Sequence, residues 1–279
     1  MSVSYTLNGY EISGTSLTEG MYLLRETQYA SSLAPRVATV EIPNIHYVVP
    51  MFDDPLDQIT ISLAVRLQGT DADSLRLLWN NLMGRLYMGA NRPINVLRNR
   101  GSVSEQADAK LISTSAPDFD CGRNRLDATI VLGIPGGAWR GPYVEQQLGD
   151  GNGQSLTTIV NSTRPIGDAM LRVLGPMDVL EVYDATSRTG IRWDTSTTVP
   201  SLQYLLVDVA SMQARIQTSQ TWDLSQGTRA DAGLTFIGYR PLTLCPNWGT
   251  AATTPTASVN VTLTGGAGAV TIRSRYAVV

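Results

Sequence analysis

Few residues in this chain could perform acid–base, nucleophilic or metal chemistry. His46 is the single histidine, which excludes catalytic centres and metal sites that need two histidines. Its neighbours Asn44 and Tyr47 supply neither a nucleophile nor a group that would orient the imidazole ring, so we interpret His46 as an ordinary loop or strand residue. The sequence also contains no Gly-x-Ser-x-Gly turn and no glycine loop followed by Lys-Ser or Lys-Thr.

Carboxylates that lie close together along the chain are the remaining candidates for catalysis. They are Asp118 with Asp120, and Asp53 and Asp54 with Asp57. Two carboxylates can hydrolyse a glycosidic bond without histidine, but only at a particular separation in space that spacing in a loop does not give. A carboxylate-based hydrolase is therefore the third hypothesis for function. The stretch Asp150–Gly153 begins like a calcium loop but lacks the terminal glutamate, so no metal or cofactor is predicted.

Aromatic residues in the second half of the chain could bind a sugar. They are Tyr183, Trp193, Trp222 and Trp248. Aromatic rings stack on sugar rings in wet sites, so a glycan-binding module is the second hypothesis. For Trp193 and Trp222, a position in the core of a β-sandwich is the preferred interpretation.

The charge pattern gives no sign of a polyanionic partner. The net charge is −3 and 16% of residues are charged, whereas nucleic acids and membrane surfaces call for a clustered basic face. No apolar run has the length of a membrane-spanning helix, and Met1–Gly14 lacks the pattern of a secretory signal. We therefore expect a protein made in a cytoplasm, with Cys121 and Cys245 as free thiols.

Hydrophobic periodicity predicts a mostly β protein. Residues Ile59–Leu67 alternate strictly between aliphatic and other side chains, which is typical of a strand with one buried face. Ala128–Ile134 and Val259–Leu263 repeat this alternation, and Gly265–Gly268 is expected to form a hairpin turn before the last strand. Weaker strands are predicted at Met21–Gln28, Ile94–Arg98, Ala109–Thr114, Ala169–Leu174, Val179–Tyr183, Gln203–Val207 and Ala269–Tyr276.

One segment, near residues 71–88, is predicted to be a helix. Its apolar residues fall on one stripe of a 3.6-residue period. They are Leu75, Leu78, Trp79, Leu82 and Leu86. Thr70 or Asp71 can cap the start of this helix, and Gly89 can end it.

Glycines divide the chain near its midpoint. The stretch Gly136–Ser155 contains six glycines and no sustained apolar pattern, which is typical of a linker or long loop. A length of 279 residues suits two domains. We expect a first domain over 1–140, a glycine-rich linker over 141–155 and a second domain over 156–279.

The order of these elements resembles a known family. In the first half of the chain, the resemblance rests on the strand Ile59–Leu67, the helix after Gly69-Thr70-Asp71, the strands Ala107–Thr114 and Leu126–Ile134, and the turn Pro135–Arg140 with its Trp-Arg pair. In the second half, the resemblance rests on the segments Met170–Pro176, Val182–Gly190, Leu205–Asp208 and Val270–Ala277. Together they resemble the distal tail proteins (minor tail proteins) of long-tailed, siphovirus-type bacteriophages.

This resemblance implies a β-rich α+β fold, with an N-terminal split β-barrel-like ring domain that carries one helix and a C-terminal galectin-like β-sandwich. It implies a structural virion protein that is not an enzyme. Such a protein forms a ring, usually of six subunits, at the distal end of the tail tube, and joins the tube to the tail tip or baseplate and the host-adhesion apparatus.

The resemblance also implies partners and a location. The partners are further copies of the chain, the tail tube protein, the tail tip or hub protein, the tape-measure protein and a receptor-binding protein. Specific nucleic-acid binding, membrane insertion, a cofactor and catalytic residues are not implied. The protein would assemble in the cytoplasm of the host bacterium and reside at the tail tip of the virion.

Overall fold

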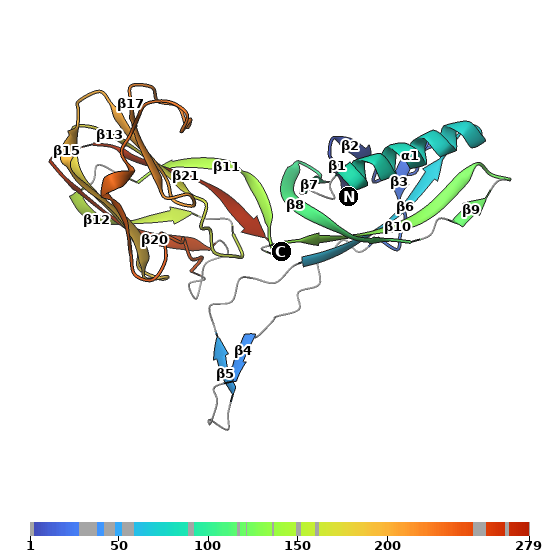
Figure 1. Ribbon diagram of the computed structural model, residues 1–279, viewed down its shortest axis with the longest axis horizontal. Coiled ribbons are helices and arrows are strands. Elements are labelled where there is room, and N and C mark those ends of the chain that lie inside the picture. The colour runs from blue at the N-terminus through green and yellow to red at the C-terminus, as the bar shows by residue number, and fades with distance from the viewer. Residues whose placement is uncertain are drawn as a thin grey trace. The chain divides into compact units, whose positions relative to one another are not determined.

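The computed structural model describes residues 3–27, 38–41, 48–51, 59–88, 92–115, 118–120, 122–135, 137–148, 152–159, 162–247, 255–265 and 268–278. This part of the chain is mostly β, with antiparallel sheets and one α-helix, as the sequence predicts (Figure 1). The chain folds as two units that divide between Gly141 and Pro142. The α-helix is not long and apolar enough to cross a membrane, and the described residues contain no other candidate.

The strands of unit 1 follow one another in a barrel-like order. The order is β2 (Tyr10–Ile12), β1 (Val3–Leu7), β7 (Ile94–Arg100), β8 (Val103–Thr114), β10 (Arg125–Ile134), β6 (Ile59–Gln68) and β3 (Gly20–Leu23). Ser13, directly after β2, forms a parallel bridge with Tyr22 of β3. The Ser13 amide donates to the Met21 carbonyl at 3.0 Å, and the Leu23 amide donates to the Ser13 carbonyl at 2.8 Å. This bridge joins the two ends of the strand order around a single core.

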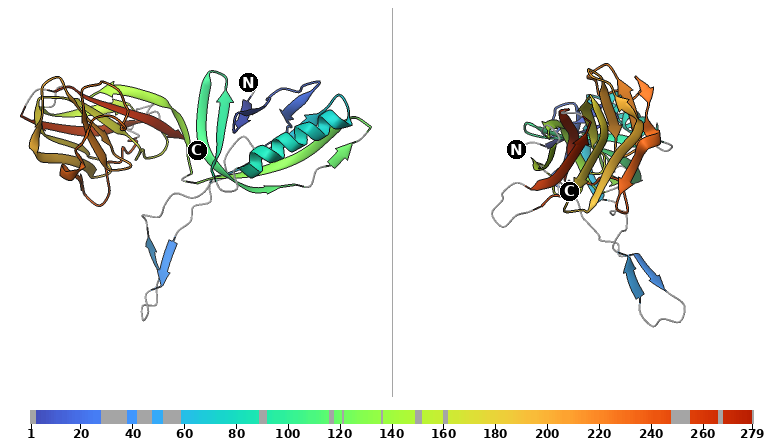
Figure 2. Two further views of the ribbon diagram at one scale, coloured as in Figure 1. Left: turned by 45° about the horizontal axis from the view of Figure 1, so that its top comes forward. Right: turned by 90° about the vertical axis from the view of Figure 1, so that its left-hand side faces the viewer.

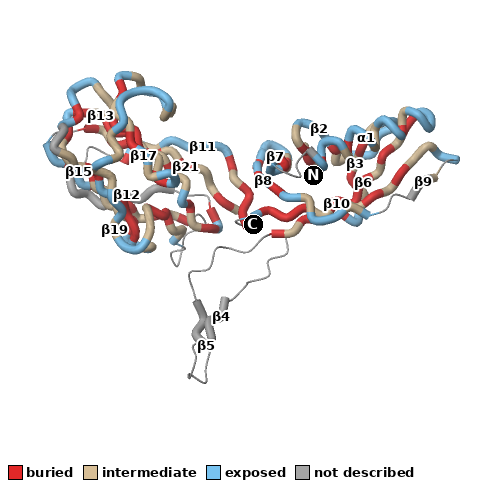
Figure 3. The backbone as a smooth tube through the Cα atoms, in the orientation of Figure 1, coloured by how far each residue is buried: buried red, intermediate tan, exposed pale blue. Residues whose placement is uncertain are grey.

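The core of unit 1 follows directly from the predicted alternation. The five aliphatic residues of β6 from Ile59 to Leu67 have no exposed surface. In the neighbouring strand β10, Leu126 lies opposite Leu67 and Ile130 opposite Leu63. Because opposite residues of antiparallel strands share a face, the two strands present one continuous apolar layer. Figure 3 shows the resulting alternation of buried and half-buried residues along both strands.

The predicted helix is confirmed as α1 (Ala72–Met88). Leu75, Leu82 and Leu86 of the predicted stripe are buried, while Leu78 and Trp79 are half-buried. At the helix start, the Ser74 amide donates to Asp71 Oδ1 at 2.7 Å and the Asp71 amide donates to Ser74 Oγ at 3.1 Å. This reciprocal pair satisfies two amides that the helix itself leaves without a partner.

Asn8 fixes the other end of α1. The Arg85 guanidinium donates to the Asn8 carbonyl at 2.6 Å, and the Asn8 side-chain amide donates to the Arg85 carbonyl at 3.1 Å. The second of these bonds satisfies a carbonyl of the last helical turn, which has no partner within the helix. The turn between β1 and β2 is thereby bonded to the helix.

A buried ion pair lies inside unit 1. Arg98 of β7 is 1% exposed, and its Nε donates to Glu105 Oε2 of β8 at 2.8 Å. The Arg98 guanidinium also lies 4.1 Å from the centroid of the Trp139 ring, which is itself fully buried and 6.2 Å from the Tyr5 ring. Desolvation lowers the pKa of Arg98, and the Glu105 carboxylate opposes that effect. The carboxylate is therefore required to keep this charge inside the protein.

A separate hairpin leaves unit 1 between β3 and β6. It consists of β4 (Ala38–Glu41) and β5 (Val48–Met51), which pair with each other (Figure 1). Neither strand pairs with any other described strand.

Unit 2 contains two antiparallel layers (Figure 2). One has the order β18 (Thr228–Arg229), β17 (Gln213–Gln217), β16 (Tyr204–Asp208), β13 (Met170–Leu174), β21 (Val270–Val278) and the part of β11 (Trp139–Gln147) that follows Gly141. The other has the order β12 (Asn152–Ile159), β20 (Thr256–Thr264), β14 (Met177–Asp184), β15 (Thr189–Val199) and β19 (Leu234–Ile237). A short 3-10 helix, η1 (Asp231–Gly233), precedes β19. The predicted strands of the second half are all present.

Two details predicted from glycines are wrong. The expected linker over 141–155 contains the larger part of β11 and the start of β12. The expected hairpin turn at Gly265–Gly268 connects β20 and β21, which belong to different layers. The Gly268 position lies against the Leu174 backbone, where an added Cβ would be 1.9 Å from the carbonyl oxygen. Glycine is needed there for close approach of two backbones, which produces the same compositional signal as a tight turn.

Candidate functional site

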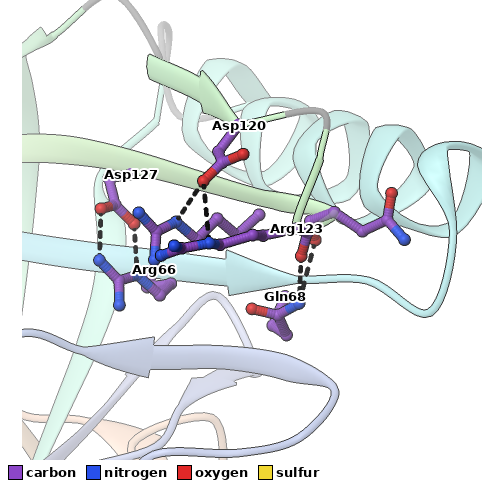
Figure 4. Close-up of polar contacts among 7 residues, drawn as sticks. Arg66, Gln68, Asp120, Arg123 and Asp127 are labelled. Atoms are coloured by element: carbon purple, nitrogen blue, oxygen red, sulfur yellow. Dashed lines mark hydrogen bonds and ion pairs between the residues drawn. The ribbon is translucent and has the colours of Figure 1, made fainter.

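The structure describes only part of the predicted chemical candidates. Outside the described residues lie His46, Asp53, Asp54, Asp57, Cys121 and Trp248. Asp118 belongs to β9 (Asp118–Asp120), which pairs with β10. Asp120 forms ion pairs with Arg123 at 3.8 Å and with Arg125 at 3.2 Å (Figure 4). Among the described residues, no three side chains of His, Cys, Asp or Glu gather as a metal site would require.

Cys245 is a half-buried free thiol, as predicted. Desolvation by burial raises its pKa, and the nearby Asp184 carboxylate acts in the same direction while Arg240 opposes both. The thiol is therefore protonated at neutral pH. Because the thiolate is the nucleophilic form, Cys245 is not an activated nucleophile.

The described members of the proposed sugar-binding set, Tyr183, Trp193 and Trp222, do not share one surface. Trp193 of β15 has no exposed surface, and its indole Nε1 donates to the Ala230 carbonyl at 2.9 Å. Tyr183 belongs to β14 of the same layer. Trp222 lies between β17 and β18 and contacts Arg172 of β13, in the other layer. Of the described members of the set, only Trp222 takes part in a larger cluster of polar and aromatic side chains.

One face of unit 1 carries a half-buried ion pair. Arg66 of β6 lies opposite Asp127 of β10, and its Nε and Nη2 both donate to that carboxylate at 2.6 Å (Figure 4). Tyr22 of β3 lies opposite Arg66 on the other side. Beside the pair is a hollow of about 420 Å³, lined also by Glu26, Ser115 and Thr129. This polar face is the outer side of the strands whose inner side forms the core.

Asp127→Asn should make unit 1 less sensitive to acid. The hydrogen bonds from Arg66 are the main cause that lowers the pKa of Asp127. The pair therefore stabilises the fold above the carboxyl's unfolded pKa of about 3.9, and this contribution is lost as pH falls through the lower folded pKa. Because both side chains are partly exposed, at 25% and 34%, we expect a loss of only about 1 kcal/mol at pH 7. Urea denaturation at pH 7 and pH 3 measures both effects. Parallel losses of stability on acidification in both proteins would contradict the assignment.

Unit 2 carries a larger cluster, which we call the arginine–aromatic surface. It consists of Tyr143 of β11, Arg172 of β13, Arg273 and Arg275 of β21, and Trp222. Because β21 lies between β11 and β13 in the strand order, the three arginines come from adjacent strands. Arg273 and Arg275 are two residues apart on β21 and so point to the same side of the layer.

Each ring of this surface lies against guanidinium groups. The Arg172 group is 4.4 Å from the centroid of the Trp222 ring, and the Arg273 group is 5.6 Å from the same centroid. The Tyr143 ring has Arg273 at 4.1 Å and Arg275 at 4.8 Å. These separations are within the range of cation–π attraction, so the rings restrict the arginines to a few conformations.

Two carboxylates also belong to the arginine–aromatic surface. Glu145 Oε1 accepts a hydrogen bond from the Trp222 indole at 2.7 Å, and its Oε2 lies 3.8 Å from Arg172 Nη2. Arg275 Nη2 donates to Asp168 Oδ2 at 3.0 Å. Arg172 is further bonded to the Gln220 carbonyl at 2.7 Å. Three guanidinium groups and two carboxylates leave one positive charge in excess at this surface.

The arginine–aromatic surface is not predicted from the sequence. Its only sequence signal is the spacing of Arg273 and Arg275 within the last predicted strand, which places both on one side. Nothing in the sequence indicates that Tyr143, Arg172 and Trp222 are their neighbours, because strand order in a sheet depends on long-range pairing.

Comparison with known proteins gives a result for the fold. No protein family and no curated protein matches the sequence. Over nearly its whole length, the chain nevertheless has the fold of a phage adsorption hub protein. That protein is Dit (gp 19.1) of phage SPP1, described as a paradigm of the hub adsorption apparatus in phages that infect Gram-positive bacteria. The alignment covers 99% of each chain, with a TM-score of 0.64 and 12% sequence identity. A chain of the phage P2 baseplate in its activated conformation with Ca aligns over 99% of this chain and 98% of its own, with a TM-score of 0.43 and 12% identity.

Proposed function

We propose that this chain is a structural protein of a bacteriophage tail tip, namely a distal tail protein of a long-tailed, siphovirus-type phage. The observation that carries the proposal is the fold match to the SPP1 hub protein over 99% of both chains. A widespread domain would match only one part of a chain, whereas here both units match one and the same known structure, in the same order along the chain. Fold alone does not define function. The order of elements in both halves of the sequence resembles the same family.

In this proposal the protein acts by contact and is not an enzyme. Copies assemble through unit 1 into a closed ring, most simply of six subunits, because a head-to-tail contact repeated by a suitable rotation closes on itself. Unit 2 is a galectin-like β-sandwich on the outside of the ring. The ring joins the tail tube to the tail tip or baseplate and to the host-adhesion apparatus. The partners are the tube, tip or hub, tape-measure and receptor-binding proteins.

The β4–β5 hairpin supports a role in assembly. A two-stranded hairpin is marginally stable in water unless it packs against something else. Within the described part of the chain, β4 and β5 pair only with each other. We therefore propose that this hairpin packs against a neighbouring copy of the chain in the ring.

Replacing residues 28–58 by a short Gly-Ser linker should abolish ring formation and leave unit 1 folded. The hairpin has no strand pairing with the barrel-like sheet, so its removal leaves the described pairs of β3 and β6 in place. Mass photometry and two-dimensional class averages of the full chain should show a species of about six times the 30.1 kDa subunit mass. The variant should run as a monomer with an unchanged circular dichroism spectrum.

The control is Leu202→Ser, which alters a side chain of unit 2 that is 82% exposed. This variant should form rings as the wild type does if unit 1 makes the contacts. A wild-type protein that stays monomeric at micromolar concentration, with no rings in micrographs, would overturn the proposal. Rings that persist after removal of the hairpin would refute its part in assembly alone.

A further inference from the structure

We propose that Arg273, together with Tyr143 and Trp222, forms a docking site on unit 2 for an acidic segment of another protein. The inference concerns unit 2 alone and does not require that the chain forms a ring.

Arg273 has unused hydrogen-bonding capacity. It forms no hydrogen bond with the described part of the chain, and its Nε is buried without a hydrogen-bond partner. The nearest carboxylate oxygen, Glu145 Oε1, is 4.0 Å from that nitrogen, which is too far for a hydrogen bond. The side chain is 27% exposed, so the group can still be reached from solvent. A guanidinium carries five N–H donors in a planar fork that matches a carboxylate. The Nε donor is buried, so an external carboxylate would meet the donors of the two Nη nitrogens.

The guanidinium of Arg273 is also held in place. The Tyr143 ring lies 4.1 Å from it and the Trp222 ring 5.6 Å from it. Trp222 is fixed in turn by its indole hydrogen bond to Glu145 at 2.7 Å. A side chain that is already ordered loses less conformational entropy on binding, which favours affinity. Among the three arginines of this surface, Arg172 and Arg275 already donate to protein oxygens. Arg273 is therefore the one prepared for an external anion.

The charges around Arg273 favour an isolated carboxylate over a continuous polyanion. The surface has an excess of one positive charge, within a chain of net charge −3. Closely spaced charges of an anionic polymer would also meet the carboxylates of Glu145 and Asp168, which repel them. A single aspartate or glutamate on a protein segment can reach Arg273 and avoid both. Its apolar neighbours can then cover Tyr143, which is 47% exposed.

The residue types agree with a protein partner. Tyr, Trp and Arg are the side chains that contribute most to the binding energy of protein interfaces. They do so where rings and guanidinium groups pack together and exclude water. On this chain Tyr143 and the three arginines lie on three adjacent strands of a sheet, which provide a rigid support, and Trp222 packs against them from the connection between β17 and β18.

The test is selection of binders from a random peptide library on the immobilised full-length protein. The selected peptides should contain one or two Asp or Glu residues beside aromatic or aliphatic ones. The best of them, measured by calorimetry as a synthetic peptide, should bind Arg273→Gln at least about tenfold more weakly, because a charge-assisted bond is lost. Arg273→Lys keeps the charge without the fork and should also weaken binding, which separates geometry from net charge.

The matched control is Arg192→Gln on β15, an outward-facing strand arginine that is already paired with Asp194 and Glu181. It should leave peptide binding unchanged. Mass photometry of the same samples reads ring formation separately, so failure of either idea is visible alone. Peptides without acidic residues, or equal affinity for the wild type and Arg273→Gln, would overturn the proposal. So would an oligogalacturonate that binds at Arg273 more tightly than any selected peptide.

Discussion

Replacing Glu105 by glutamine is expected to destabilise unit 1 by about 3–5 kcal/mol, because it leaves a buried charge without its partner. The Glu105 side chain is 6% exposed and lies 2.6 Å from Arg98 Nη2 and 3.1 Å from Arg100 Nη2. Glutamine has nearly the same shape and can still accept a hydrogen bond, so the change removes the charge and little else. The Arg98 guanidinium then remains in a desolvated position beside the fully buried Trp139. Urea denaturation at pH 7 measures the loss.

Two further variants test the cause of this effect. Glu181→Gln changes a glutamate that is 36% exposed and 3.4 Å from Arg192, and it should have little effect because such pairs are screened by water. The double variant Arg98→Met, Glu105→Leu replaces both charges by apolar groups of similar volume. It should recover most of the stability lost in Glu105→Gln. A double variant as unstable as the single one would show that packing, and not the buried charge, is responsible.

Trp193→Ala is expected to destabilise unit 2 by about 3–5 kcal/mol, which is typical of deleting a large buried aromatic side chain. The ring has no exposed surface, so its removal leaves a cavity between the two layers of unit 2. The Ala230 carbonyl also loses the hydrogen bond from the indole at 2.9 Å. Thermal denaturation followed by circular dichroism gives the change.

Trp222→Ala is the matched comparison for Trp193→Ala. Trp222 is half-buried and lies on the outer side of its layer against Arg172, so its loss should cost about 1 kcal/mol, as for a partly exposed cation–π contact. Comparable losses in the two variants would be inconsistent with a core position for one and a surface position for the other.

Local patterns were sufficient to predict the α-helix and ten of the 21 described strands. Ile59–Leu67 and the helical stripe from Leu75 to Leu86 were predicted correctly because burial on one face imposes a period of two or of 3.6 residues. Both depend on residues that are near in sequence. Two errors, at 141–155 and at Gly265–Gly268, arose from glycines, whose composition does not distinguish a flexible linker from strand ends or from close backbone contacts. A third is the predicted strand Met21–Gln28, which ends at Leu23.

The candidate site could not be predicted in the same way. Tyr143 and Arg273 are 130 positions apart in the numbering of the chain, and they meet because β11 lies beside β21. The sequence likewise made Trp193 and Trp222 candidates for sugar binding, but it does not show that Trp193 is buried and Trp222 partly exposed. Both distinctions depend on which strands become neighbours and which side of a layer faces inward, and these are properties of the whole fold.

Pro50 determines which edge of the β4–β5 hairpin can pair with a further strand. It lies within β5, opposite Thr39 of β4. A proline has no amide hydrogen and is tolerated in a strand where its nitrogen faces the unpaired edge of the sheet. An incoming strand alongside β5 would lack a donor at that point, whereas β4 contains no proline. Another polypeptide is therefore expected to extend this hairpin along β4. A sheet contact made by the hairpin would then use only one of its two edges.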